Sequence, residues 1–169
     1  MSDVATEADL DVEEYYDDGP VLPRWRPWAA LALSLIGFGI SMYLTIDHFE
    51  GIVPICSSKG FVDCELVTTS KYSYILGVPV SLLGLLFFTA MVGINLPPLW
   101  RTPARWVAWG RLALSVSGIC FVLYLLAAEL FSIKAICLWC TGVHVITVCL
   151  FGVVLAGQAA ARRETAVLA

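Results

Sequence analysis

Residues 135–161 read AICLWCTGVHVITVCLFGVVLAGQAAA, a run of 27 residues without a charged side chain between Lys134 and Arg162. The hydrocarbon core of a bilayer takes about 17–25 apolar residues of α-helix, so this run is long enough to cross a membrane. It opens with two cysteines three positions apart, Cys137 and Cys140. The stretch therefore predicts a membrane-spanning helix that carries a pair of thiols at its start.

Three further runs lack charged side chains: residues 27–46, 72–100 and 112–128, which contain 20, 29 and 17 residues. The whole chain is 59% hydrophobic and 14% charged, with a mean hydropathy of +0.83. A soluble domain is usually about 45–50% apolar and about 25% charged. We therefore predict an all-α membrane protein, in which residues 25–161 form a bundle of four transmembrane helices. The third run is the shortest, and we expect Arg111 and Glu129 to extend it by reaching toward the two membrane interfaces.

The basic residues predict the orientation of these helices. All seven arginines lie before the first run, between the second and third, or after the fourth, whereas the other two loops hold the three lysines. By the positive-inside rule, both termini are cytoplasmic and the loop between the first and second helices is extracytoplasmic. Eight of the fourteen acidic residues lie in the first 18 positions. We therefore predict a disordered acidic cytoplasmic tail over residues 1–24, and a short cytoplasmic tail over residues 162–169.

Four of the six cysteines fall on the predicted outer side of the membrane, where disulfides persist. Cys56 and Cys64 lie in the loop between the first two helices, separated by seven residues in a turn-rich segment that can close readily. This pair is either a static structural disulfide or a redox-active pair. The other two, Cys120 and Cys149, are expected to be small apolar core residues.

The CLWC motif at residues 137–140 favours redox chemistry. Residues three apart on a helix have Cβ atoms about 5–6 Å apart, close to the range of a disulfide. In the first turn of a helix, unpaired N–H groups and the positive end of the helix dipole stabilise a thiolate. The alternatives are two inert buried thiols, or half of a zinc site, for which these cysteine spacings are a loose match.

Two cysteine pairs on one side of a membrane suggest a two-step relay. The loop pair can exchange with a soluble protein, whereas the CLWC pair lies at the rim of an apolar bundle that a lipid-soluble electron carrier can reach. Attack of a thiolate on a disulfide moves two electron equivalents between such pairs.

This pattern resembles the bacterial branch of the vitamin K epoxide reductase family over most of the chain. The matching features are Cys56 and Cys64, Ser70 six residues later, GVPVSLLG at residues 77–84, and CLWC at residues 137–140. A second type of four-span membrane oxidase has its CxxC in the first outer loop and the wider pair in the second. The order here is the reverse, which argues against that type.

The resemblance implies a four-helix bundle that encloses a quinone, of the menaquinone (vitamin K) or ubiquinone type, beside the CxxC motif. It implies that Cys56 reacts with a thioredoxin-like protein and that Cys64 then attacks Cys137. Cys140 would be the thiolate next to the quinone ring. Ser70 matches a Ser/Thr position near the quinone, where its hydroxyl could bond a quinone oxygen or a neighbouring group.

His144 shares one helical face with both cysteines of the motif, because it follows them by four and seven positions. It is either a quinone-site residue that accepts a proton or a hydrogen-bonded core histidine. We expect Glu129, Asp47 and His48 to be boundary residues near the outer interface.

We therefore expect a multi-pass enzyme of the cell (inner or plasma) membrane, a thiol–quinone oxidoreductase. It would reoxidise an extracytoplasmic thioredoxin-like protein, pass the electrons to the membrane quinone pool, and so support disulfide formation in exported proteins. Many bacterial members carry a fused thioredoxin-like domain; this chain ends at Ala169, so we expect that partner to be a separate protein. No metal and no nucleic-acid partner is expected. The alternatives are a quinone epoxide reductase, as in the animal branch, and a non-catalytic membrane scaffold with structural disulfides or a metal site.

Overall fold

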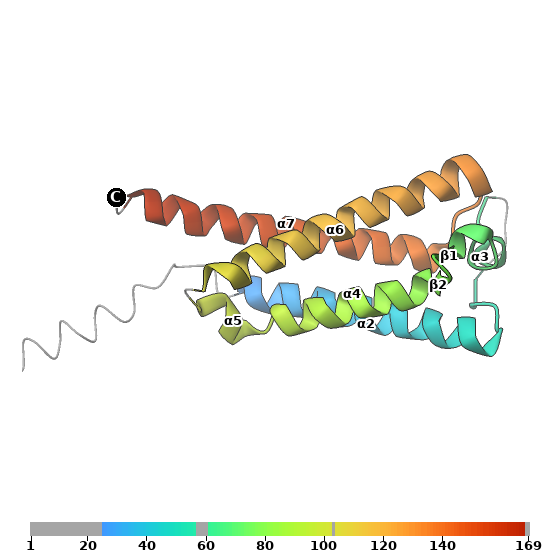
Figure 1. The fold of residues 1–169 in the computed structure, drawn as a ribbon, viewed down its shortest axis with the longest axis horizontal. Helices are drawn as coiled ribbons and strands as arrows, with labels where there is room; N and C mark the ends of the chain where they lie inside the picture. Colours follow the sequence, from blue (N-terminus) through green and yellow to red (C-terminus); the bar gives the residue numbers. More distant parts are fainter. Residues whose placement is uncertain (1–24, 57–60, 103, 168–169) are drawn as a thin grey trace, which may run out of the picture.

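The computed structural model describes residues 25–56, 61–102 and 104–167. The predicted acidic tail, residues 1–24, lies outside the described residues. Four helices run side by side in alternating directions (Figure 1): α2 (Trp25–Glu50), α4 (Val80–Ile94), α6 (Arg105–Ala127) and α7 (Leu138–Val167). A π-helical segment, η2 (Ala128–Ile133), continues α6. The short elements are α3 (Cys64–Thr68), the 3₁₀ turn η1 (Lys71–Ser73), strands β1 (Tyr74–Ile75) and β2 (Val78–Pro79), and α5 (Pro97–Arg101).

Within the described part of the chain, three helical segments are long and apolar enough to cross a membrane: Trp25–Glu50, Arg105–Ile133 and Leu138–Ala159. The predicted helical membrane architecture is therefore confirmed, but the count of four spans is not. The remaining helix, α4, has 15 residues. It extends over about 22 Å, against about 30 Å for the core of a bilayer.

The second apolar run is divided because a β-hairpin occupies its beginning. Strands β1 and β2 pair antiparallel, with Ile75 opposite Val78. The two residues between them, Leu76 and Gly77, both have positive φ, 53° and 81°. A two-residue hairpin turn of this kind needs positive φ at both positions, which glycine adopts without cost. Helix α4 can therefore begin only after Pro79.

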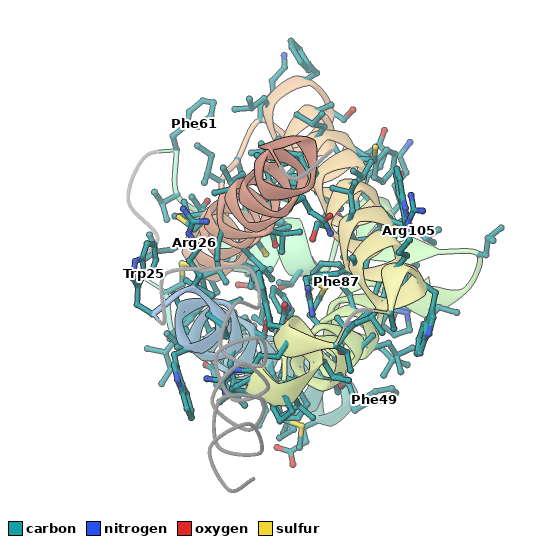
Figure 2. All side chains as sticks on the ribbon, turned by 90° about the vertical axis from the view of Figure 1, so that its left-hand side faces the viewer. Trp25, Arg26, Phe49, Phe61, Phe87 and Arg105 are labelled. Atoms are coloured by element: carbon teal, nitrogen blue, oxygen red, sulfur yellow. A yellow bond between two sulfur atoms is a disulfide. The ribbon has the colours of Figure 1, made fainter. Side chains whose placement is uncertain are left out.

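The helices approach closely where small side chains face large ones. Gly37 of α2 lies against the ring of Phe88 on α4, where any Cβ would clash. Phe88 belongs to a buried cluster with Ala30, Met91, Trp100 and Leu150. Viewed along the bundle (Figure 2), Phe87 points into the space between the helices, whereas Trp25 points outward. Small residues at such contacts are typical of helix packing in membranes.

The prediction that Arg111 reaches toward a membrane interface is wrong, because its side chain is 4% exposed inside the bundle. Its Nη2 donates hydrogen bonds to the carbonyl oxygens of Ile94 (2.9 Å) and Leu99 (3.5 Å). The guanidinium group also lies 4.0 Å from the ring centroid of Trp100. The carbonyl of Ile94 ends α4 without a helical partner, and Arg111 satisfies it. The carbonyl of Leu99 also accepts from the Thr102 hydroxyl (2.8 Å), and the longer bond from Arg111 adds a link between α5 and α6.

The prediction for Glu129 is also wrong, since this side chain is 3% exposed within the bundle. Cys120 and Cys149 are likewise misassigned, because both are exposed on the outer faces of α6 and α7 and not in the core. In a membrane, lipid-facing positions are as apolar as buried ones. Hydropathy alone therefore does not tell which face of a helix is buried.

Candidate functional site

A short backbone bridge joins the cysteine loop to the CLWC motif. The amide of Ile136 donates to the carbonyl of Phe61 (3.0 Å), and the amide of Asp63 donates to the carbonyl of Ile136 (3.1 Å). Because Cys64 follows Asp63 and Cys137 follows Ile136, the bridge brings one cysteine of each pair together. Both are buried, with exposures of 1% and 0%, in a single apolar cluster.

The other end of the loop is also held against the motif. The indole Nε1 of Trp139 donates to the carbonyl of Ile55 (3.0 Å), and the amide of Ile55 donates to the hydroxyl of Tyr43 (3.1 Å). The ring centroids of Tyr43 and Trp139 lie 5.1 Å apart. Ile55 directly precedes Cys56, so the residues before both loop cysteines are tied to the segment that carries CLWC.

The two cysteine pairs differ in their bonding. Cys56 and Cys64 form a disulfide, whereas Cys137 and Cys140 are free thiols. Cys56 is partly exposed and Cys64 is buried. A thiol arriving from the aqueous side can therefore reach Cys56 more easily than Cys64.

Cys137 takes the capping position of α7, directly before the first helical residue. Its Sγ accepts a hydrogen bond from the backbone N–H of Cys140 (3.2 Å), as a serine oxygen does at other helix starts. The hydrogen bond from the Cys140 thiol lowers the pKa of Cys137, and backbone amides add to this effect. Burial and the charge of Glu129 oppose it. The predicted helix N-terminus is thus present, with Cys137 as its cap and Cys140 in its first turn.

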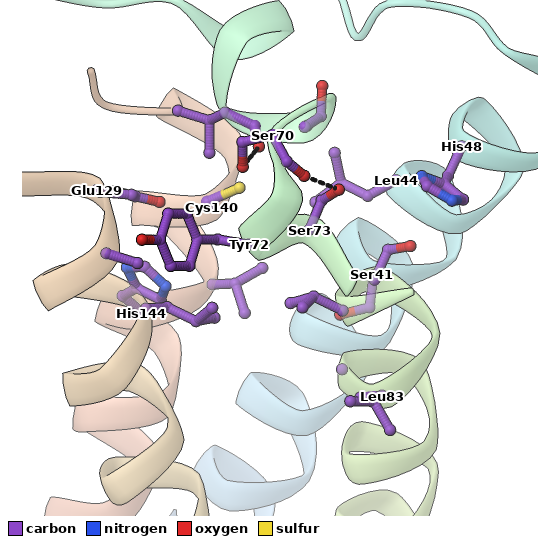
Figure 3. A pocket seen from close by; sticks show the side chains of 18 of the residues that line it. Ser41, Leu44, His48, Ser70, Tyr72, Ser73, Leu83, Glu129, Cys140 and His144 are labelled. Atoms are coloured by element: carbon purple, nitrogen blue, oxygen red, sulfur yellow. Dashed lines mark hydrogen bonds between the residues drawn. The ribbon is translucent and has the colours of Figure 1, made fainter. Parts of the chain in front are cut away.

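A cavity of about 670 Å³ lies beside this cysteine cluster, between the helices. Figure 3 shows Cys140, Glu129, Tyr72 and His144 gathered toward one end of it. Much of the remaining wall is apolar, with side chains such as Leu44 and Phe87. Its size lies within the range of small-molecule and cofactor sites, about 300–1,000 Å³.

Four buried polar atoms in the cavity wall have no hydrogen-bond partner among the residues that the structure describes. They are Asp47 Oδ2, Ser81 Oγ, Glu129 Oε2 and His144 Nδ1. An unsatisfied buried polar atom costs about 1–3 kcal/mol, and native proteins pair most of them. The wall therefore suits an apolar molecule with a few polar atoms, such as a ring with carbonyl oxygens and an isoprenoid chain, which is the chemistry of a quinone.

The predicted site residues divide between the cluster and the cavity. Cys56, Cys64 and Cys137 belong to the cysteine cluster, whereas Ser70 and His144 line the cavity. Cys140 belongs to both. The Ser70 hydroxyl donates to the carbonyl of Val67 (2.8 Å), so in this conformation it can only accept a hydrogen bond from a ligand.

Asp47, His48 and Glu129 are expected from the sequence to be boundary residues at the outer interface, but all three line the cavity. The signal for Glu129 was its place between two long apolar segments, since an ionisable residue inside a membrane segment is a functional candidate by default. Glu129 also lies in a π-helical turn, a feature frequent at functional sites. Within residues 25–56, 61–102 and 104–167, no three His, Cys, Asp or Glu side chains form a group that could hold a metal ion.

Comparison with known families agrees with this geometry. The vitamin K epoxide reductase family matches residues 28–155, which run from Trp28 in α2 to Leu155 in α7 and include the cysteine loop and the CLWC motif. That match covers well over half of the chain. The chain belongs to the vitamin K epoxide reductase family, whose members are membrane oxidoreductases that link thiol–disulfide exchange to quinones.

Proposed function

We propose that this protein is a thiol–quinone oxidoreductase that transfers electrons from an extracytoplasmic thioredoxin-like protein to a membrane quinone. The position of Cys140 carries the proposal. Its thiol packs in the cysteine cluster and also lines the apolar cavity. A single residue therefore connects a chain of exchangeable sulfur atoms to a space suited to a quinone.

The first proposed step is exchange at the loop disulfide. A thiolate of the reduced partner attacks Cys56, the more exposed sulfur, and releases Cys64 as a thiolate. The second thiol of the partner then displaces Cys56. The partner leaves as a disulfide, and the loop pair holds the two electrons and two protons as thiols.

The second step passes these electrons to the CLWC pair. Cys64 attacks Cys137 in a Cys137–Cys140 disulfide and releases Cys140. Cys56 then displaces Cys137 from Cys64 and restores the loop disulfide. A closed loop pair with two CLWC thiols, the arrangement in the structure, corresponds to the proposed state after this exchange.

The third step is oxidation of the CLWC pair. A bound quinone accepts two electrons and two protons. Cys137 and Cys140 supply both as they form their disulfide. His144 Nδ1 and the Ser81 hydroxyl, which have no partner in the described residues, are available to orient the polar atoms of the ligand.

We also propose four membrane crossings, with α4 and its flanking residues as the fourth. In support, α4 runs antiparallel to α2 along the bundle (Figure 1). Arg101, the last residue of α5, and Arg105, the first residue of α6, lie at the end of the bundle opposite the cysteines. By the positive-inside rule that end is cytoplasmic, and the cysteine cluster faces the extracytoplasmic side of the cell membrane.

The test is quinone reduction by the purified protein in detergent. The assay contains a reduced thioredoxin-like protein and a short-chain menaquinone or ubiquinone analogue, and the absorbance of the quinone is followed. The wild-type protein should reduce the quinone and Cys140→Ala should not, whereas Cys120→Ala and Cys149→Ala, which change lipid-facing thiols, should match the wild type. No reduction by the wild-type protein, or full activity of Cys140→Ala, would refute the proposal. A parallel assay with a quinone epoxide and a dithiol donor tests for epoxide reduction.

A further inference from the structure

Glu129 is a buried acid at the edge of the candidate site. It lies in η2, is 3% exposed, and its Oε2 has no hydrogen-bond partner in the described part of the chain. Burying a carboxyl group without such a partner costs stability. A purely structural role therefore does not account for this side chain.

Glu129 lies close to both thiols of the CLWC motif. Its charge acts on Cys137 and on Cys140, and it lines the cavity together with Cys140. Figure 3 shows its carboxyl group on the same side of the cavity as the Cys140 sulfur. The carboxyl group can therefore meet both the reacting sulfur and a molecule in the cavity.

Oxidation of the CLWC pair releases two protons in a place that water reaches poorly. Cys137 is fully buried, and Cys140 is half-buried. Other titratable groups that face the cavity are Asp47 and His48 from α2, Tyr72 from η1, Tyr74 from β1, and His144 from α7. Glu129 lines the cavity on the same side as the Cys140 sulfur (Figure 3) and is buried, so its carboxyl group can meet protons that water does not reach.

We propose that Glu129 is the proton carrier between the CLWC thiols and the quinone, an inference that rests on the proposed function. Its carboxylate accepts the proton of Cys140 and delivers it to one quinone oxygen. Once ionised again, it carries the proton of Cys137 to the second oxygen. Two S–H bonds break, one S–S bond forms, two electrons and two protons reach the quinone, and Glu129 returns to its starting state.

Glu129→Gln tests the proposal, because glutamine keeps the shape of the side chain but carries no exchangeable acid proton. The two half-reactions are measured separately. In quinone-free protein, alkylation and mass spectrometry follow the appearance of CLWC thiols after addition of the reduced thioredoxin-like protein. In prereduced protein, stopped-flow absorbance follows a single reduction of the quinone analogue. Glu65→Gln, which changes an exposed acid on α3, is the matched control.

We expect Glu129→Gln to slow the quinone half-reaction about 100-fold or more, the usual effect of losing a general acid or base. Thiol exchange in quinone-free protein should be slowed far less, because the thiols of the partner supply its protons and no quinone oxygen has to be protonated. Glu129→Asp should recover part of the quinone rate. Time-resolved infrared spectra of the wild type, recorded during the quinone half-reaction, should show a transient carboxyl band that Glu129→Gln lacks.

Equal slowing of both half-reactions would show a structural role and overturn the proposal. If Glu129→Gln completes the quinone half-reaction at the wild-type rate, the proposal that Glu129 carries protons is also overturned. The proposed function then still stands. Absence of a carboxyl band in the wild-type spectrum also counts against it, and this measurement needs no variant that folds. If the wild-type protein itself reduces no quinone, the proposed function fails, which separates the two outcomes.

Discussion

The indole N–H of Trp139 donates a 3.0 Å hydrogen bond to the backbone carbonyl of Ile55. This bond links the centre of the CLWC motif to the residue before Cys56. With the bridge between Val62 and Ile136, it fixes the loop pair over the start of α7. Thiol–disulfide exchange requires one sulfur to approach another closely, so these contacts have a direct consequence for the rate of exchange.

Loss of that hydrogen bond should slow exchange between the two pairs. Trp139→Phe keeps an aromatic ring beside Tyr43 but removes the N–H donor. A net hydrogen bond is worth about 1 kcal/mol, so the population of the aligned loop should fall about fivefold. The rate at which CLWC thiols appear in quinone-free protein measures this effect. Trp106→Phe, a change at an exposed tryptophan, is the control, and equal rates for both variants would contradict the prediction.

Cys137 should have two separable roles, as a helix cap and as a thiol. Cys137→Ser keeps a cap acceptor for the N–H of Cys140, whereas Cys137→Ala removes it. Both variants should lose quinone reduction. The alanine variant alone should lose about 0.5–2 kcal/mol of stability, the usual cost of a missing N-cap. Thermal unfolding in detergent measures the difference, and equal stabilities of the two variants would show that the sulfur does not cap α7.

Gly118 should set the width of the cavity where α6 faces α4 and α7. A Cβ at this position would lie 2.7 Å from the ring of Phe87 and 3.1 Å from the Thr147 methyl group, and all three residues line the cavity. Gly118→Ala should therefore weaken binding of the quinone analogue, with a stability loss of about 1–3 kcal/mol from overpacking. Exchange between the cysteine pairs should be unchanged. Gly39→Ala is the matched control, because no atom beyond its own turn of helix lies within 4 Å of its Cβ position.

Arg111 should stabilise the end of the bundle opposite the cysteines. Arg111→Met leaves the carbonyls of Ile94 and Leu99 without this donor, at a cost of about 1–3 kcal/mol. We expect a lower midpoint of thermal unfolding in detergent, whereas Arg105→Gln, at an exposed position, should unfold like the wild type. If Arg111→Met unfolds at the wild-type midpoint, the prediction is wrong. The free-energy cost of burying the charge of Arg111 would then equal the stabilisation that its hydrogen bonds provide.

The sequence predicts the helical membrane architecture well because charge-free runs of this length are rare in soluble folds. It also predicts that CLWC opens the last helix. It does not predict the length of α4, since the hairpin turn at Leu76 and Gly77 lies inside an unbroken apolar run. Nor does it predict the burial of Glu129, because in a lipid-facing bundle the hydrophobic pattern of a helix does not distinguish the inner face from the outer one.

The bridge that brings Cys64 near Cys137 likewise has no sequence signature. It consists of backbone hydrogen bonds between Ile136 and residues 61 and 63, which side-chain types do not encode. The resemblance to a known family implies that Cys64 attacks Cys137, whereas the structure supplies the backbone contacts that bring these two residues together.

Electrons should pass from Cys64 to Cys137, and one measurement tests this step most directly. The double variant Cys56→Ser/Cys140→Ser keeps Cys64 and Cys137, and its matched control Cys64→Ser/Cys140→Ser keeps Cys56 and Cys137. Disulfide formation in glutathione redox buffers is quantified by mass spectrometry of non-reduced peptides. We predict that the Cys64–Cys137 disulfide forms readily and persists under more reducing conditions than the Cys56–Cys137 disulfide of the control. Equal behaviour of the two variants, or no Cys64–Cys137 disulfide, would contradict the proposed relay.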